Sequence, residues 1–159
     1  MISTEVRFFP VIVVTFRGPY TRQIIDAYFE QQCTLARRAL REGMFLISVA
    51  RSPDAPDAQT RRWIAEATQQ MPLELRERTV RSVCIVDGAV QRGIVTAMSW
   101  LFKDMADLEA VASEDEAIGA VLPLLASRGQ PVPPGFDGDA LRRAFEAALG
   151  PHKPGAGAP

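Results

Sequence analysis

Short apolar runs and amphipathic stretches alternate along this chain. The apolar runs are Val11–Phe16, Met44–Ala50, Val80–Val86 and Leu108–Ala112. The amphipathic stretches that follow them begin near Thr21, Asp57, Ala89 and Ser113. Strands that alternate with helices at this spacing indicate βαβ crossovers. The pattern therefore predicts an α/β fold with a mainly parallel β-sheet and helices on both faces.

The helices are predicted from their apolar spacing and from the residues at their ends. They are Arg22–Glu42, Ala58–Met71, a short turn at Leu73–Arg78, Ala89–Phe102 and Glu114–Leu125. Thr21, Asp57 and Ser113 are good N-caps, and Glu116 completes a capping box with Ser113. Gly43 is expected to end the first helix with a positive φ. Because proline breaks the helical hydrogen-bond ladder, Pro123 should kink or end its helix.

The first helix has an apolar face near helical spacing. Its members are Ile25, Tyr28, Phe29, Leu35, Ala36, Ala39 and Leu40. Before this helix, Val6–Phe9 and Val11–Phe16 predict two strands, or one strand bent at Pro10. Since proline cannot donate to a sheet ladder, the first piece is expected at the edge.

The composition changes at the C-terminal end of the chain. Residues 1–128 are interpreted as one α/β domain, and Gly129–Asp139 as a linker rich in proline and glycine. Ala140–Leu149 is a short amphipathic helix, and residues 150–159 are expected to be a disordered tail. An isolated helix of this length is unstable in water. We therefore expect Leu141, Phe145 and Leu149 to dock on the domain, or on a second copy of it.

The length and net charge of the chain limit the classes of protein to which it can belong. A chain of 159 residues with a net charge of −1 suits one globular domain and has no electrostatic drive toward nucleic acid. No apolar run is long enough for a signal peptide or a transmembrane segment, so a cytoplasmic location is expected. Cys33 and Cys84 lie in an amphipathic helix and an apolar strand, which indicates buried thiols in a reducing compartment.

The chain contains few residues of the kinds that form catalytic sites. The single histidine, His152, lies in the tail, which disfavours a catalytic triad or a histidine zinc site. The turns after the strands match neither G-x-G-x-x-G nor a Walker A loop. Glu114, Asp115 and Glu116 point in different directions on a helix and do not converge on one ion. The sequence therefore predicts no enzyme, no metal and no cofactor.

The carboxyl ends of the predicted strands carry Arg17, Arg51, Ser52 and Asp87. Ligands of open α/β sheets usually bind at these ends. Arg17 and Arg51 are placed near helix N-termini, where anions bind. Solvated loop charges are the alternative interpretation, and we favour it.

The stretch Val80–Leu125 resembles a known family. It combines a strand and a turn with Arg92-Gly93-Ile94-Val95-Thr96-Ala97-Met98-Ser99-Trp100-Leu101, a further strand and Ser113-Glu114-Asp115-Glu116-Ala117. This order is similar to the SpoIIAA-like branch of the STAS superfamily, over roughly Thr4–Leu125. The resemblance implies a right-handed superhelix of four βα units, a fold shared with the lipid-binding CRAL-TRIO domains.

In classical STAS regulators, a partner anti-sigma kinase phosphorylates a Ser or Thr within an Asp-Ser-x-Gly pattern after the second core strand. The matching segment here is Asp57-Ala58-Gln59-Thr60, which keeps the Asp and lacks the Ser and Gly. No phosphosite is therefore carried over.

Two hypotheses of function follow. The first is a non-catalytic regulatory domain, similar to an anti-sigma-factor antagonist, that docks another protein such as an anti-sigma or kinase-like regulator. Its expected interaction surface comprises Arg51, Ser52, Asp57, Thr60 and Asp87. The alternative is a carrier or sensor of a hydrophobic small molecule or lipid in a CRAL-TRIO-like pocket. That pocket is expected to be lined by Met98, Trp100, Leu101 and Phe102. A homodimer is left open by the sequence.

Overall fold

A mainly parallel sheet forms the centre of the molecule. The computed structural model describes residues 1–53, 56–86, 88, 93, 95 and 107–150. Its strands are β1 (Ile2–Glu5), β2 (Val11–Phe16), β3 (Leu46–Arg51), β4 (Thr79–Ile85) and β5 (Asp107–Val111). They lie side by side in chain order, with β1 antiparallel to β2 and every later pair parallel. The predicted α/β class with a mainly parallel sheet is confirmed.

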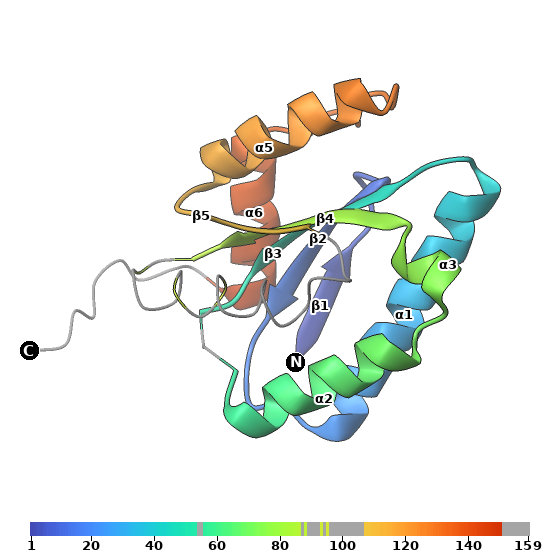
Figure 1. The fold of residues 1–159 in the computed structure, drawn as a ribbon. Helices are drawn as coiled ribbons and strands as arrows, with labels where there is room; N and C mark the ends of the chain where they lie inside the picture. Colours follow the sequence, from blue (N-terminus) through green and yellow to red (C-terminus); the bar gives the residue numbers. More distant parts are fainter. Residues whose placement is uncertain (54–55, 87, 89–92, 94, 96–106, 151–159) are drawn as a thin grey trace, which may run out of the picture.

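Helices cover both faces of the sheet, as predicted (Figure 1). They are α1 (Arg22–Arg41), α2 (Ala58–Gln70), α3 (Leu73–Arg76), α5 (Glu114–Ser127) and α6 (Gly138–Leu149). The helices α1, α2 and α3 lie on one face, and α5 and α6 lie on the other. The crossovers from β2 to β3 and from β3 to β4 advance the sheet in the same direction. Because such crossovers share one handedness, α1 and α2 fall on the same face.

The two faces of the central strands differ in the size of their side chains. Large aliphatic side chains point toward α5 and α6 and form a cluster with Val121, Leu125, Leu141 and Phe145. These strand residues are Val11, Val13, Ile47, Val49, Val83 and Ile85. On the opposite face a smaller cluster joins Ile12 and Leu46 to α1 and α3. The larger of the two hydrophobic clusters therefore lies between the sheet and the helices α5 and α6.

The predicted helix caps are confirmed. The side chains of Thr21, Asp57 and Ser113 accept hydrogen bonds from backbone N–H groups of the first turns of α1, α2 and α5. Glu116 does not complete the expected capping box, because it accepts from the N–H of Ala112, 2.9 Å away, rather than from that of Ser113. These bonds satisfy donors that a helix start otherwise leaves open. Gly43 has a φ of 68° at the end of α1, as expected.

The expected strand at Val6–Phe9 is wrong, whereas the expected edge position is correct. The edge strand is Ile2–Glu5, and residues 7–10 form turns. The Phe9 N–H donates to the Val6 carbonyl over 3.0 Å, and the Val11 N–H donates to that of Phe8 over 2.8 Å. These turns reverse the chain, so the apolar Phe8 serves as a core residue rather than a strand residue.

Two expectations about helix faces and ends are also wrong. Of the kink or end expected at Pro123, the end is wrong, because α5 continues to Ser127 with Val121 and Leu125 fully buried on either side of the proline. Leu40 was expected on the apolar face of α1, and it is 38 % exposed. In the same turn Ala39 is fully buried and takes the inward position, so Leu40 lies at the edge of the buried face.

The C-terminal helix docks on the domain, as expected. Leu141 and Phe145 are buried in the cluster under α5, and Leu149 is half-buried. Phe136, within the predicted linker, packs edge-on against Phe8 with ring centroids 5.4 Å apart. The helix α6 thus contributes to the same core as β2. The expected tail, residues 151–159, lies outside the described residues.

Both cysteines are free thiols, as expected, but the expectation that they are buried is wrong, because both residues are partly exposed. None of the helices in the described ranges combines the length and hydropathy that a membrane span requires. The predicted helix Ala89–Phe102 falls almost wholly outside the described residues.

Candidate binding cavity

A cavity of about 250 Å³ lies between the sheet and the helices α1 and α2. Strands β3 and β4 form its floor, and the inward sides of α1 and α2 form its walls. The described lining residues are Phe16, Tyr20, Ile25, Tyr28, Phe29, Gln32, Ser48, Ala50, Ser52, Pro56, Thr60, Ile64, Thr68, Met71, Arg76, Thr79, Ser82, Cys84, Ile85, Val86, Val95 and Leu108. Most of this lining is apolar.

The cavity exists because the strand residues beneath it are small. Ser48 pairs with Ser82 across β3 and β4, and Ala50 pairs with Cys84 one step further along. Successive residues of a strand point to opposite faces. The same strands therefore present Val and Ile toward α5 and these four short side chains toward α1 and α2. The short side chains do not fill the space up to the helices.

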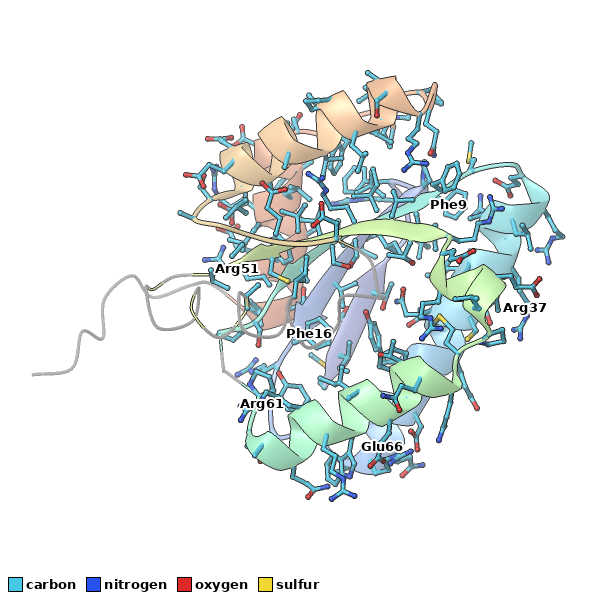
Figure 2. All side chains as sticks on the ribbon, in the orientation of Figure 1. Phe9, Phe16, Arg37, Arg51, Arg61 and Glu66 are labelled. Carbon is cyan, nitrogen blue, oxygen red and sulfur yellow. The ribbon has the colours of Figure 1, made fainter. Side chains whose placement is uncertain are left out.

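Aromatic rings form one wall of the cavity. The rings of Phe16 and Tyr28 meet edge-to-face with centroids 5.4 Å apart, and Tyr28 meets Phe29 in the same way at 5.2 Å. Figure 2 shows Phe16 in the layer between the sheet and α2. Aromatic pairs of this geometry are rigid and give an apolar ligand a defined surface.

Six polar residues of the lining lie toward the amino ends of β3 and β4, which we call the polar end, whereas Tyr20, Ser52 and Thr60 line the cavity elsewhere. It comprises Gln32, Ser48, Thr68, Arg76, Thr79 and Ser82. Gln32 is 7 % exposed, and its Nε2 has no hydrogen-bond partner among the described residues. The Nε of Arg76 is also buried, and the described part of the chain gives it no partner. Thr68, by contrast, donates its hydroxyl to the Ile64 carbonyl over 2.8 Å.

The ionisable groups of the cavity floor and aromatic wall are held neutral. Burial raises the pKa of the Cys84 thiol to about 12. Burial, together with the nearby Cys84, raises the pKa of the Tyr28 hydroxyl above its ordinary value. A nucleophilic cysteine needs a depressed pKa, because the thiolate is the reactive form. Cys84 therefore serves as a small apolar wall residue at neutral pH.

The structure brings two of the predicted surface residues into the cavity wall, Ser52 and Thr60. Thr60 is 3 % exposed, so it lies inside the molecule rather than on an interaction surface. Asp57 is exposed and caps α2 with its carboxylate 2.7 Å from the Thr60 N–H. This hydrogen bond holds the pKa of Asp57 below its usual range. Asp87, Met98, Trp100, Leu101 and Phe102 lie outside the described residues.

Arg51 lies on the other face of the sheet. The expectation that it is a solvated loop charge is wrong. Its guanidinium pairs with Glu114 of α5, and the side chains are 15 % and 11 % exposed. The alternation of β3 points Arg51 away from Ser52 and toward α5. A second cavity of about 210 Å³ adjoins this pair and is lined by Arg142, Phe145 and Glu146 of α6. Arg17 reaches the same helix by donating to the Leu149 carbonyl over 3.2 Å.

Sequence reasoning missed Gln32 and the small face of the strands. Gln32 follows Tyr28 by four residues and Phe29 by three, so it sits on the apolar stripe of α1. A polar residue on such a stripe is the signal that marks it. The alternation of Ser48, Ala50 and Ser52 with larger residues is the matching signal in β3.

Comparison of the chain with protein-family models, with curated proteins and with solved structures found no match. Within the described residues, no three His, Cys, Asp or Glu side chains gather closely enough to hold a metal ion. The evidence for function is therefore the cavity itself.

Proposed function

We propose that this protein binds a small apolar molecule in the cavity between the sheet and α1 and α2, as a carrier or sensor. The observation that carries the proposal is the cavity of about 250 Å³ with its largely apolar lining. Protein interiors are packed as densely as organic crystals, and voids larger than a water molecule are few. Small-molecule sites are concave and mostly apolar, with a few placed polar groups. This cavity is larger than a water molecule and mostly apolar, and it carries a few polar groups.

The apolar surface of the cavity supports a ligand. Burial of apolar surface away from water is favourable and is roughly proportional to the area buried. Apolar cavities even smaller than this one bind small apolar molecules in other proteins. A ligand that covers the aromatic wall and the floor of the cavity removes their apolar surface from water, which is the driving force of the proposed binding.

The burial of Thr60 favours this hypothesis over a phosphorylated regulator. A kinase needs an exposed hydroxyl, whereas Thr60 is 3 % exposed and lines the cavity. The resemblance to STAS regulators stays a prediction. The ligand-binding alternative has a specific structural feature in its support, although the residues first expected to line its pocket lie outside the described ones.

Isothermal titration with 1-octanol tests the proposal. Ala50, at 7 % exposure, lies on the cavity floor, so Ala50→Leu fills part of the space. Ala147→Leu on the exposed side of α6 adds the same side chain without entering the cavity. We expect one octanol per chain for the wild type and for Ala147→Leu, and at least ten-fold weaker binding for Ala50→Leu. No binding to the wild type, or equal binding to all three chains, contradicts the proposal.

A further inference from the structure

We propose that the ligand of this cavity carries a carboxylate, which Gln32 and Arg76 hold at the polar end while the apolar part points toward Phe16 and Tyr28. This inference rests on the proposed function and specifies the chemical class of its ligand. It is carried by two buried N–H donors without partners and by the distribution of charge in the cavity wall.

The topology places the two donors at the same end of the cavity. The helix α1 starts after β2 and returns antiparallel to the strands, so Gln32 lies further toward their amino ends than Ile25. Arg76 ends α3 and precedes Thr79, the first residue of β4. The helices α1 and α3 pack against each other. Gln32 and Arg76 therefore approach the amino ends of the strands from neighbouring helices.

Both donors are unusual in a folded protein. Nearly all buried polar atoms have a hydrogen-bond partner, because leaving one unpaired costs free energy. Gln32 is only 7 % exposed, and its Nε2 lacks a partner within the part of the chain that the structure describes. The Nε of Arg76 lacks one as well, and Arg76 forms no ion pair with the residues that the structure describes. Both N–H groups can donate a hydrogen bond, and the described residues provide no acceptor for either.

The positive charge in the cavity wall favours an anionic ligand. Of the described lining residues, Arg76 alone carries a charge, and that charge is positive. A carboxylate accepts hydrogen bonds at two oxygens, and charge-assisted bonds of this kind are stronger than those between neutral groups. Ser48 and Ser82 add neighbouring hydroxyl groups to the polar end. A ligand with an amine would bring a second positive charge to the same end, and repulsion from Arg76 disfavours such a ligand.

The size of the cavity guides the choice of probe. One water molecule takes about 30 Å³ of the liquid, so 250 Å³ holds on the order of ten non-hydrogen atoms. Octanoate and phenylpropanoate have this size. A medium-chain fatty acid or an aryl-substituted short acid therefore fits within the cavity.

The test compares octanoate with 1-octanol, which has the same chain without the charge. We expect the wild type to bind octanoate at least ten-fold more tightly than 1-octanol in isothermal titrations. Arg76→Met and Gln32→Leu each weaken octanoate at least five-fold more than they weaken 1-octanol. Arg76→Lys keeps most of the preference. Arg37→Met and Gln31→Leu remove the same groups from exposed positions of α1 and bind both probes as the wild type does (Figure 2 shows Arg37 on the outer side).

Binding of 1-octanol reports that each variant is folded and that its cavity is intact. Equal affinity of the wild type for the two probes overturns the carboxylate inference and leaves the proposed function standing. An equal loss of both probes in Arg76→Met also overturns the inference, because it indicates damage to the cavity rather than loss of charge recognition. Failure of both probes to bind the wild type removes the proposed function and the inference together.

Discussion

The guanidinium of Arg51 lies 2.5 Å from the carboxylate of Glu114, and this ion pair ties the end of β3 to the first turn of α5. With side chains 15 % and 11 % exposed, neither charge is well solvated. Removing one partner leaves the other charge largely buried. We expect Arg51→Met to lower the free energy of unfolding by about 2–4 kcal/mol in urea titrations.

The double variant Arg51→Met with Glu114→Leu is the matched control for this pair. It removes both charges, so we expect it to recover most of the loss. A double variant whose loss equals the sum of the two single losses would show that the two charges do not interact.

The cap at Asp57 gives α2 a dependence on pH. The Thr60 N–H, as the largest cause, holds the pKa of Asp57 below its usual range. A carboxyl whose folded pKa is lowered stabilises the protein above its unfolded pKa, and this stabilisation is lost as pH falls through the folded value. We expect Asp57→Ala to lower the melting temperature at pH 7 and to differ less from the wild type near pH ~2.

Asp57→Asn separates the hydrogen bond from the charge. Asparagine caps helices about as well as aspartate and does not titrate. Its melting temperature at pH 7 should therefore stay close to that of the wild type. If all three chains lose stability in parallel as the pH falls, Asp57 is not the titrating group.

Gln32 is predicted to cost stability in the ligand-free protein. Gln32→Leu replaces an unpartnered buried amide with an apolar side chain, so we expect the free energy of unfolding to rise by about 1 kcal/mol. Gln31→Leu, on the exposed side of the same helix, should change it by less than about 0.5 kcal/mol. Urea titration of both variants measures these changes in the free energy of unfolding. A loss of stability in Gln32→Leu would mean that the amide has a structural role.

Phe145 anchors the C-terminal helix. It is 1 % exposed within the cluster under α5, so Phe145→Ala should lower the free energy of unfolding by about 3–5 kcal/mol. Leu149→Ala, at a half-buried position of the same helix, should have a smaller effect. Equal stability of Phe145→Ala and the wild type in urea would show that α6 is not held in solution.

Cys84 is predicted to resist thiol reagents. Its pKa of about 12 leaves little thiolate at pH 8. In a Cys33→Ser background, we expect iodoacetamide to modify Cys84 at least a hundred-fold more slowly in the folded protein than in urea. The rate should increase in proportion to the unfolded fraction across the urea transition. Rapid modification of the folded protein would show that the thiol is ionised and accessible.

The strands and helix starts were predictable because their signals are local. An apolar run of five to seven residues specifies a strand, and a side chain such as Thr21 or Ser113 caps a helix through a bond within three residues. The turn at residues 7–10 was not predictable in this way. Phe8 and Phe9 look like strand residues, and only their packing against Phe136 and Arg38 distinguishes them.

The cavity was not predictable because it depends on two layers at once. The sequence places Ser48 and Ala50 on one face of β3. It does not say how far α1 and α2 stand from that face. Gln32 looked like an ordinary polar residue of a long helix until α3 brought Arg76 beside the same space. Periodicity identifies which residues face inward, whereas unfilled volume depends on distances between elements.

The order of the strands has a consequence for synthesis of the chain. Since each strand lies beside the one before it, the sheet can grow one strand at a time as the chain leaves the ribosome. The helix α6 is made after the strands β1 to β5, and it packs on β2. Until Phe145 has emerged, Val11 and Val13 lack part of their cover on that face. A nascent chain that stalls before α6 would therefore expose an apolar strip that chaperones recognise.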